Sequence, residues 1–196
     1  MLNRCNALVF SADGRWSEFF CADLLSIGFM NAVCVSDFES LERSFSKHNI
    51  NYCFFSQTSE PQQVRAATQA IRFHKDDAVR FSPTILMAKE ISRQELGGYI
   101  SIGFDDIVQY PCTFGTLRTR IKRQLNNVIK YYETAEYFGP DRRNYFVSQS
   151  PNHVKRTGLA PYKCISIRRD IFKGVEIVNL FDHRPQAFTD AKWDAV

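Results

Sequence analysis

The sequence contains none of the short motifs that mark the common catalytic folds. It has no GxGxxG fingerprint, no P-loop, no GxSxG elbow and no HExxH zinc motif. It also has no run close to the roughly 18–20 apolar residues that a membrane span needs, and no apolar signal segment at its start. These absences exclude the best-marked enzyme classes, and we expect a cytoplasmic protein that is not an enzyme.

Metal-binding patterns are also missing. None of the six cysteines forms a CxxC pair or pairs with a histidine at zinc spacing, and the four histidines are scattered. The cysteines lie mostly inside apolar runs, at Cys5, Cys21, Cys34, Cys53, Cys112 and Cys164. We therefore predict no metal, no cofactor and no disulfide, with most thiols free and buried.

Charge is unevenly distributed along the chain. The net charge is +4, yet residues 1–136 carry 15 basic and 15 acidic side chains, so residues 137–196 hold the whole surplus. A solvated basic surface explains this surplus, and an acidic or nucleotide partner is the alternative. The tail has no helix-turn-helix pattern, so no nucleic-acid partner is expected.

Short apolar runs alternate with stretches of helical spacing over the first 130 residues. The runs occupy residues 7–10, 32–35, 52–55, 84–88 and 106–110. Continuous apolar strands that alternate with helices are typical of a parallel sheet covered on both faces. We therefore predict an α/β fold with a doubly wound, flavodoxin-like sheet of five parallel strands, and a site at the carboxyl ends of its strands.

One long last helix is predicted from Thr113 to about Tyr137. Its apolar positions step by three or four, at Leu117, Ile121, Leu125, Val128 and Tyr132. Two interpretations stay open: this stripe covers the sheet and the tail, or it forms the seam of a homodimer.

The end of the chain changes character after residue 130. Residues 164–167 and 175–178 could each form a short strand, but two such strands are too little for a separate core. We predict a globular domain over residues 4–130, followed by an irregular, partly ordered extension over residues 131–196.

Several sequence segments resemble those of the receiver domains of response regulators, the CheY-like family. They include LLSIGF at residues 24–29, SPTILM at residues 82–87 and GFDDIVQYPC at residues 103–112. The resemblance covers about two thirds of the chain and rests on the order of these stretches. It implies two-component signalling and phosphorelay, with a histidine kinase or another signalling protein as partner.

The resemblance also implies where phosphoryl chemistry would occur. Receivers place two acidic residues after the first strand, an Asp after the third, a Ser or Thr after the fourth and a Lys after the fifth. Here these positions fall on Ser11, Ala12, Asp13, Ser56, Ala88, Lys89 and Tyr110. A single carboxylate would bind magnesium weakly, and a Ser hydroxyl without a neighbouring base is a poor acceptor of a phosphoryl group. The expected protein is a pseudo-receiver.

A second resemblance lies at residues 137–143, YFGPDRR, which is similar to text that follows receivers in small alphaproteobacterial regulators. A helix stop with a basic turn explains it. Alternatively, Arg142 and Arg143 bind a protein partner, phosphate or a cyclic dinucleotide, since Arg168-Arg169 follows downstream.

We thus predict an atypical receiver that cannot be phosphorylated and that signals by protein–protein contact. Two alternatives remain: a module that binds a small molecule such as a cyclic dinucleotide through Arg142 and Arg143, and a receiver with residual phosphorylation on Ser56.

Overall fold

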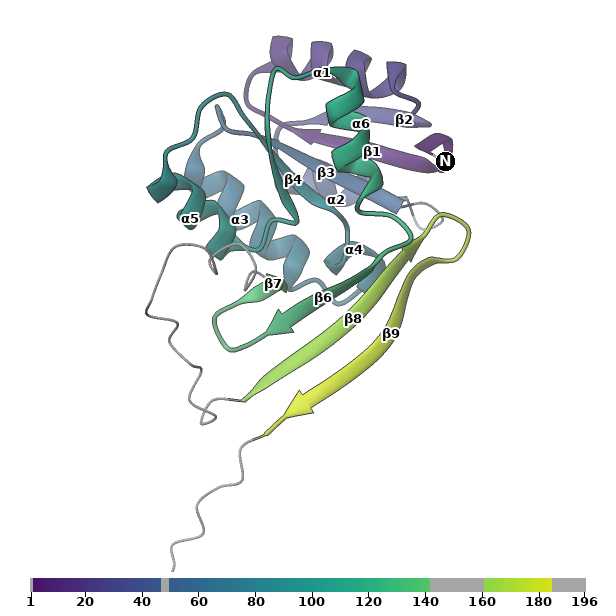
Figure 1. Cartoon of the computed structure of the whole chain (residues 1–196). Coiled ribbons are helices and arrows are strands. Elements are labelled where there is room, and N and C mark those ends of the chain that lie inside the picture. Colours follow the sequence, from purple (N-terminus) through teal and green to yellow (C-terminus); the bar gives the residue numbers. More distant parts are fainter. Residues whose placement is uncertain (1, 47–49, 142–160, 185–196) are drawn as a thin grey trace, which may run out of the picture.

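The computed structural model describes residues 2–46, 50–141 and 161–184. Figure 1 shows a parallel sheet with helices on both faces and, at one end of it, a separate antiparallel sheet made by the later part of the chain. Across these described residues, no helix has the length and apolar character needed to cross a membrane.

The parallel sheet has five strands in the order β2-β1-β3-β4-β5, which confirms the predicted α/β fold. The strands are β1 (Cys5–Phe10), β2 (Asn31–Val35), β3 (Ile50–Ser56), β4 (Thr84–Ala88) and β5 (Asp106–Gln109). Every residue of β1, β3 and β4 is buried, because helices cover both faces and leave no polar side for alternation.

Helices cover the two faces in separate groups, α1 and α6 on one face and α2, α3 and α5 on the other. The helices are α1 (Gly14–Ser26), α2 (Phe38–Arg43), α3 (Pro61–Arg72), α4 (Asp77–Arg80), α5 (Arg93–Ile102) and α6 (Phe114–Lys122), after a 3-10 turn at Leu2–Arg4. Side-chain caps begin most of them, such as Asp37 for α2 and Ser92 for α5.

The prediction of a helix from Thr113 to Tyr137 is wrong. Helix α6 ends at Lys122, and Asn126 adopts a positive φ of 60°, from which a helix cannot continue. The chain then enters β6 (Val128–Glu133). The run from Val128 to Tyr132 is β-branched and aromatic, which favours a strand.

The single helical stripe on which the predicted dimer seam rests is wrong for the same reason. Leu117, Ile121 and Leu125 are buried in the core beneath α1 and α6, whereas Val128 and Tyr132 lie on strand β6. These five side chains therefore do not form one stripe on one helix.

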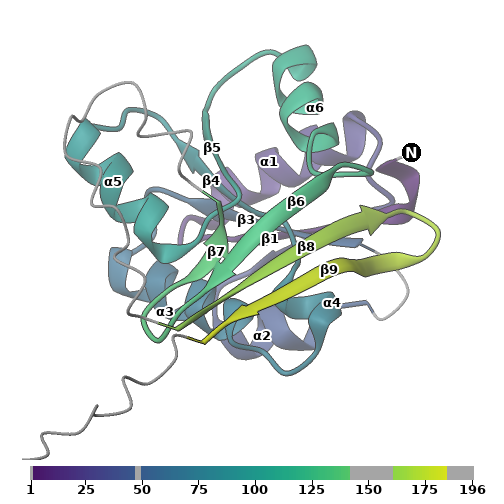
Figure 2. The same ribbon diagram turned by 60° about the horizontal axis from the view of Figure 1, so that its bottom comes forward.

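The extension is more regular than expected. Strands β6, β7 (Phe138–Pro140), β8 (Tyr162–Asp170) and β9 (Gly174–His183) form an antiparallel sheet in the order β7-β6-β8-β9 (Figure 2). The two short strands predicted in the tail lie within β8 and β9. The expected domain boundary after residue 130 falls inside β6.

One irregularity interrupts the pairing of β8 with β9. Ser166 pairs with Asn179 and Ile167 pairs with Ile177, so Val178 has no partner on β8. The extra residue makes a β-bulge in the last strand of this sheet.

The end of α5 and strand β7 meet at a close backbone contact between Gly103 and Gly139. Gly103 ends α5 with a φ of +101°, and a Cβ atom there would collide with the carbonyl oxygen of Phe138. A Cβ on Gly139 would lie 2.7 Å from the Cα of Gly103. The segments GFDD (residues 103–106) and YFGP (residues 137–140) are far apart in sequence, and their backbones are in close contact.

Substitution of Gly103 by alanine is expected to lower the free energy of unfolding by about 2–3 kcal/mol, because both the positive φ and the collision oppose a side chain. Gly98 is the matched control: it lies inside α5, and an added Cβ would meet nothing within 4 Å. Gly98→Ala should raise stability by about 0.5–1 kcal/mol. Urea unfolding measures both, and shifts of the same sign would contradict the argument.

Candidate functional site at the carboxyl ends of the parallel strands

The loop after β1 carries the first three candidate residues, and its polar groups are used locally. Ser11 is buried, and its Oγ accepts a hydrogen bond from the backbone N–H of Asp13 at 3.0 Å. The Asp13 carboxylate accepts from the backbone N–H of Trp16 at 3.0 Å and caps helix α1. Ala12 is exposed and donates its N–H to the hydroxyl of Ser59. This loop thus presents a helix cap with one exposed carboxylate.

Ser56 ends β3 at the centre of the sheet. It is 2% exposed, and its hydroxyl lies 2.7 Å from the Thr58 hydroxyl and also accepts the Thr58 backbone N–H at 3.2 Å. These bonds stabilise the turn that leads to α3. No described His, Lys or carboxylate hydrogen-bonds to this hydroxyl to activate it as a nucleophile.

Tyr110 follows β5, where a receiver would carry its lysine. The hydroxyl donates to the Asp23 carboxylate of α1 at 2.6 Å, and the ring lies edge-on to Trp16 and Phe20. Burial and the Asp23 carboxylate raise the pKa of Tyr110 well above its ordinary value. The Tyr110 hydroxyl therefore stays protonated, and its hydrogen bond to Asp23 connects β5 to α1 at this edge of the sheet.

Ala88 and Lys89 follow β4. Ala88 is buried and has no hydroxyl, and Lys89 is exposed, with its backbone N–H donating to Gln57 at 2.9 Å. The structure therefore brings the seven candidate positions to one edge of the sheet, where Asp13 carries the one carboxylate and Lys89 the one lysine among them.

Magnesium, which the fold suggests, does not fit this edge. Of the candidate positions only Asp13 carries a carboxylate, and that carboxylate is engaged as a helix cap. A hard divalent cation needs several oxygen ligands. In residues 2–46, 50–141 and 161–184, no three His, Cys, Asp or Glu side chains gather closely enough to hold a metal ion.

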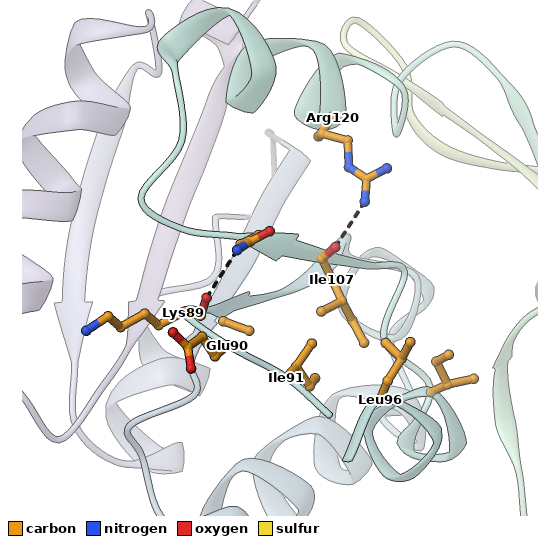
Figure 3. Close-up of a pocket in the computed structure, with 9 residues that line it drawn as sticks. Lys89, Glu90, Ile91, Leu96, Ile107 and Arg120 are labelled. Atoms are coloured by element: carbon orange, nitrogen blue, oxygen red, sulfur yellow. Dashed lines mark hydrogen bonds between the residues drawn. The ribbon is translucent and has the colours of Figure 1, made fainter. Parts of the chain in front are cut away.

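A hollow of about 450 Å³ lies beside this edge, between the β4–α5 loop, α5, β5 and α6. Its apolar floor includes Ile91, Leu96 and Ile107, and Lys89 and Arg120 stand at its border (Figure 3). Arg120 is fixed by the Ile107 carbonyl at 3.0 Å and by the Asp106 carboxylate at 2.9 Å. The hollow thus has an apolar floor, with the exposed cation Lys89 and the exposed carboxylate Glu90 at its border, and the charge of Arg120 is already paired with Asp106.

Sequence reasoning missed a buried ionic cluster between the two sheets. The Asp105 side chain, 1% exposed, binds Arg72 of α3 at 2.7 Å and Arg169 of β8 at 2.9 Å. The Tyr131 hydroxyl donates to Asp105 and accepts from Arg169, and Arg72 also donates to Thr84. Both arginine side chains are fully buried.

The electrostatics of this cluster favour its charged form. Burial alone would raise the pKa of the Asp105 carboxyl, but Arg169 and Arg72 outweigh burial and hold this pKa well below its usual value. Burial raises the pKa of Tyr131, so its hydroxyl remains a donor. The carbonyls of Phe81, Arg80, Ser82 and Gly103 and the side-chain oxygen of Gln124 accept further guanidinium hydrogens. One carboxylate and two cations are thereby paired and hydrogen-bonded within the protein interior.

This cluster bears on the paired-arginine hypothesis. Arg169 is occupied by Asp105, by Gln124 at 3.0 Å and by the Phe81 carbonyl at 2.7 Å, so it is not available to a ligand. Arg142 and Arg143 lie outside the described residues. A signal for the burial of Arg169 existed: it follows Ile165 and Ile167 at a spacing of two, on the face of β8 that is buried.

Comparison with solved structures identifies the fold. Similar chains include the chemotaxis response regulator CheY4 of Vibrio cholerae (13% identity, TM-score 0.50, 61% of this chain and 97% of that one) and the receiver domain of sensor histidine kinase PA1611 from Pseudomonas aeruginosa with magnesium in its active-site cleft (18%, 0.51, 60% and 94%). No protein-family model and no curated protein sequence matches. Over about 60% of its length, the chain therefore has the fold of receiver domains, to which it adds an antiparallel sheet.

Proposed function

We propose that this chain is a receiver without phosphoryl chemistry that acts in signal transduction by binding other proteins. The observation that carries the proposal is the set of side chains at the carboxyl edge. Ser56 ends β3, Tyr110 follows β5, and Asp13 is the one carboxylate of the loop after β1. A phosphoryl group placed there would lack an acceptor carboxylate, a magnesium site and a neutralising lysine.

The hollow beside β5 supports the protein-binding half of the proposal. Its aliphatic side chains match a partner segment with apolar anchors, and the exposed Lys89 and Glu90 at its border can pair with charged groups of that partner. The bond between Tyr110 and Asp23 holds the neighbouring edge in one arrangement. In this proposal the binding surface is therefore formed without a phosphorylation step. A histidine kinase or another two-component protein is the expected class of partner.

Incubation with acetyl phosphate and magnesium tests the first half. The intact mass is expected to stay unchanged, while a receiver with a complete site gains one phosphoryl group in the same reaction. A mass gain that Ser56→Ala abolishes would contradict the proposal and favour a residual phosphoacceptor.

The second half is tested by affinity capture from native cells with the full-length chain as bait. Ser56→Ala should retain the captured proteins, and Leu96→Glu, which places a charge in the hollow, should lose them. Glu95→Gln on the same helix is the control, since Glu95 is exposed and caps α5 outside the hollow. Equal capture by Leu96→Glu and wild type would exclude the hollow as the binding surface.

A further inference from the structure

Two cysteines far from the candidate pocket lie in unusually close contact. The sulfur atoms of Cys21 and Cys34 are 3.1 Å apart. A disulfide bond measures about 2.05 Å between the sulfurs, so an approach of about 1 Å would join them. Among the described residues, no other pair of cysteine sulfurs is in contact at this range.

The surrounding elements hold this pair together. Cys21 lies in the third turn of α1, and Cys34 lies on β2, the strand at the edge of the parallel sheet. Cys34 pairs in register with Val9 of β1, whose side chain belongs to the core beneath α1. Because paired residues share a face of the sheet, Cys34 points toward the helix that carries Cys21.

The two thiols differ in their access to solvent. Cys21 is 7% exposed, whereas Cys34 is exposed because β2 has no neighbour on its outer side among the described strands. An oxidant in solution can therefore reach the Cys34 thiol, and the buried Cys21 thiol lies next to it. Reactive cysteines with a resolving partner have this arrangement.

We propose that Cys21 and Cys34 form a reversible intrachain disulfide when the protein meets a peroxide. This modification site is independent of the proposed signalling function. The bond would join α1 to β2 and close a loop through residues 22–33.

The disulfide forms in two steps. Hydrogen peroxide transfers one oxygen to the Cys34 sulfur, which becomes a sulfenic acid, and one water leaves. The Cys21 sulfur then attacks the Cys34 sulfur, its proton leaves with the displaced hydroxyl as a second water, and the S–S bond forms. Two electrons pass from the thiols to the peroxide, whose O–O bond breaks. Cys34 is the exposed thiol of the pair and Cys21 is buried, so Cys34 meets the peroxide first.

The test uses the full-length chain treated with hydrogen peroxide and then denatured for thiol titration. Of the six thiols per chain, two should be lost, and dithiothreitol should restore them. Peptide mapping without reduction should find the peptides of Cys21 and Cys34 linked. The oxidised chain should melt about 5–10 °C higher, because the bond restricts the unfolded chain.

Variants decide the assignment. Cys34→Ser, at an exposed position, should retain the fold and prevent both the thiol loss and the rise in melting temperature. Cys164→Ser is the matched control, since Cys164 is partly exposed on β8 and should leave both effects intact. Linkage between two chains through Cys34, an unchanged thiol count, or an oxidised chain that melts lower would each overturn the proposal.

Discussion

Replacement of Asp105 by asparagine is expected to lower the free energy of unfolding by about 3–5 kcal/mol, because it leaves two buried guanidinium groups without their anion. Arg72 and Arg169 both bind the Asp105 carboxylate, and neither reaches solvent. The asparagine amide is isosteric, but its N–H₂ group would face a donor. Urea unfolding followed by circular dichroism measures the change.

Asp77→Asn is the control, since Asp77 is exposed on α4 and its substitution should change stability by about 0.5 kcal/mol or less. A loss below about 1 kcal/mol for Asp105→Asn would mean that the cluster does not hold the sheets together. Arg169→Met should also destabilise, since it removes one of the two cations that offset the burial of Asp105.

Acid unfolding gives a second readout of the same substitution. An unfolded Asp titrates near pH 4, whereas the pKa of folded Asp105 lies well below its usual value. The unfolded chain therefore binds this proton first as the pH falls. The stabilisation is complete above about pH 4 and is lost below it. Wild type should lose more stability than Asp105→Asn between about pH 4 and pH 2.

The second large effect is expected from ending the chain at residue 127, before β6. This deletion removes Tyr131, Phe138 and Ile167, which pack with Phe81 in a core shared by both parts of the chain. It also removes Arg169 from Asp105. Each buried apolar side chain contributes about 1.5–3 kcal/mol, so the total loss is comparable with the whole stability of a small domain, about 5–15 kcal/mol.

We therefore expect the fragment 1–127 to show no cooperative unfolding transition and a weak near-ultraviolet circular dichroism signal. A chain ending at residue 184 keeps every described strand and should unfold like the full protein. If the 1–127 fragment unfolded with the same midpoint as the full chain, the second sheet would be a dispensable extension.

The parallel sheet could be predicted because its signal is local. Apolar runs such as the one in β3 are long enough to mark a buried strand, and the helices between them have polar outer faces. The end of α6 could not be found in the same way. The step of three to four residues from Leu117 to Tyr132 is consistent with a helix, but α6 ends at Lys122, and Asn126 beyond it has a positive φ that a continuing helix could not contain.

The ionic cluster was missed for a different reason. Arg72 ends an amphipathic helix and Arg169 ends a strand, where arginine usually reaches solvent. Their burial depends on Asp105, which is 33 and 64 residues away in the sequence. A composition of balanced charge carries no information about such pairing. The residues at the strand ends could be named from the sequence because the resemblance to receivers gave their positions.

The bulge at Val178 affects how the last strand meets other molecules. Strand β9 exposes about half of the Ile177, Val178, Leu180 and Phe181 side chains, and no described strand pairs with its outer side. A straight edge strand with these exposed apolar side chains would act as a template for fibril growth. A β-bulge interrupts the regular row of peptide groups along a strand, so pairing of this edge with a strand of another chain is less favourable.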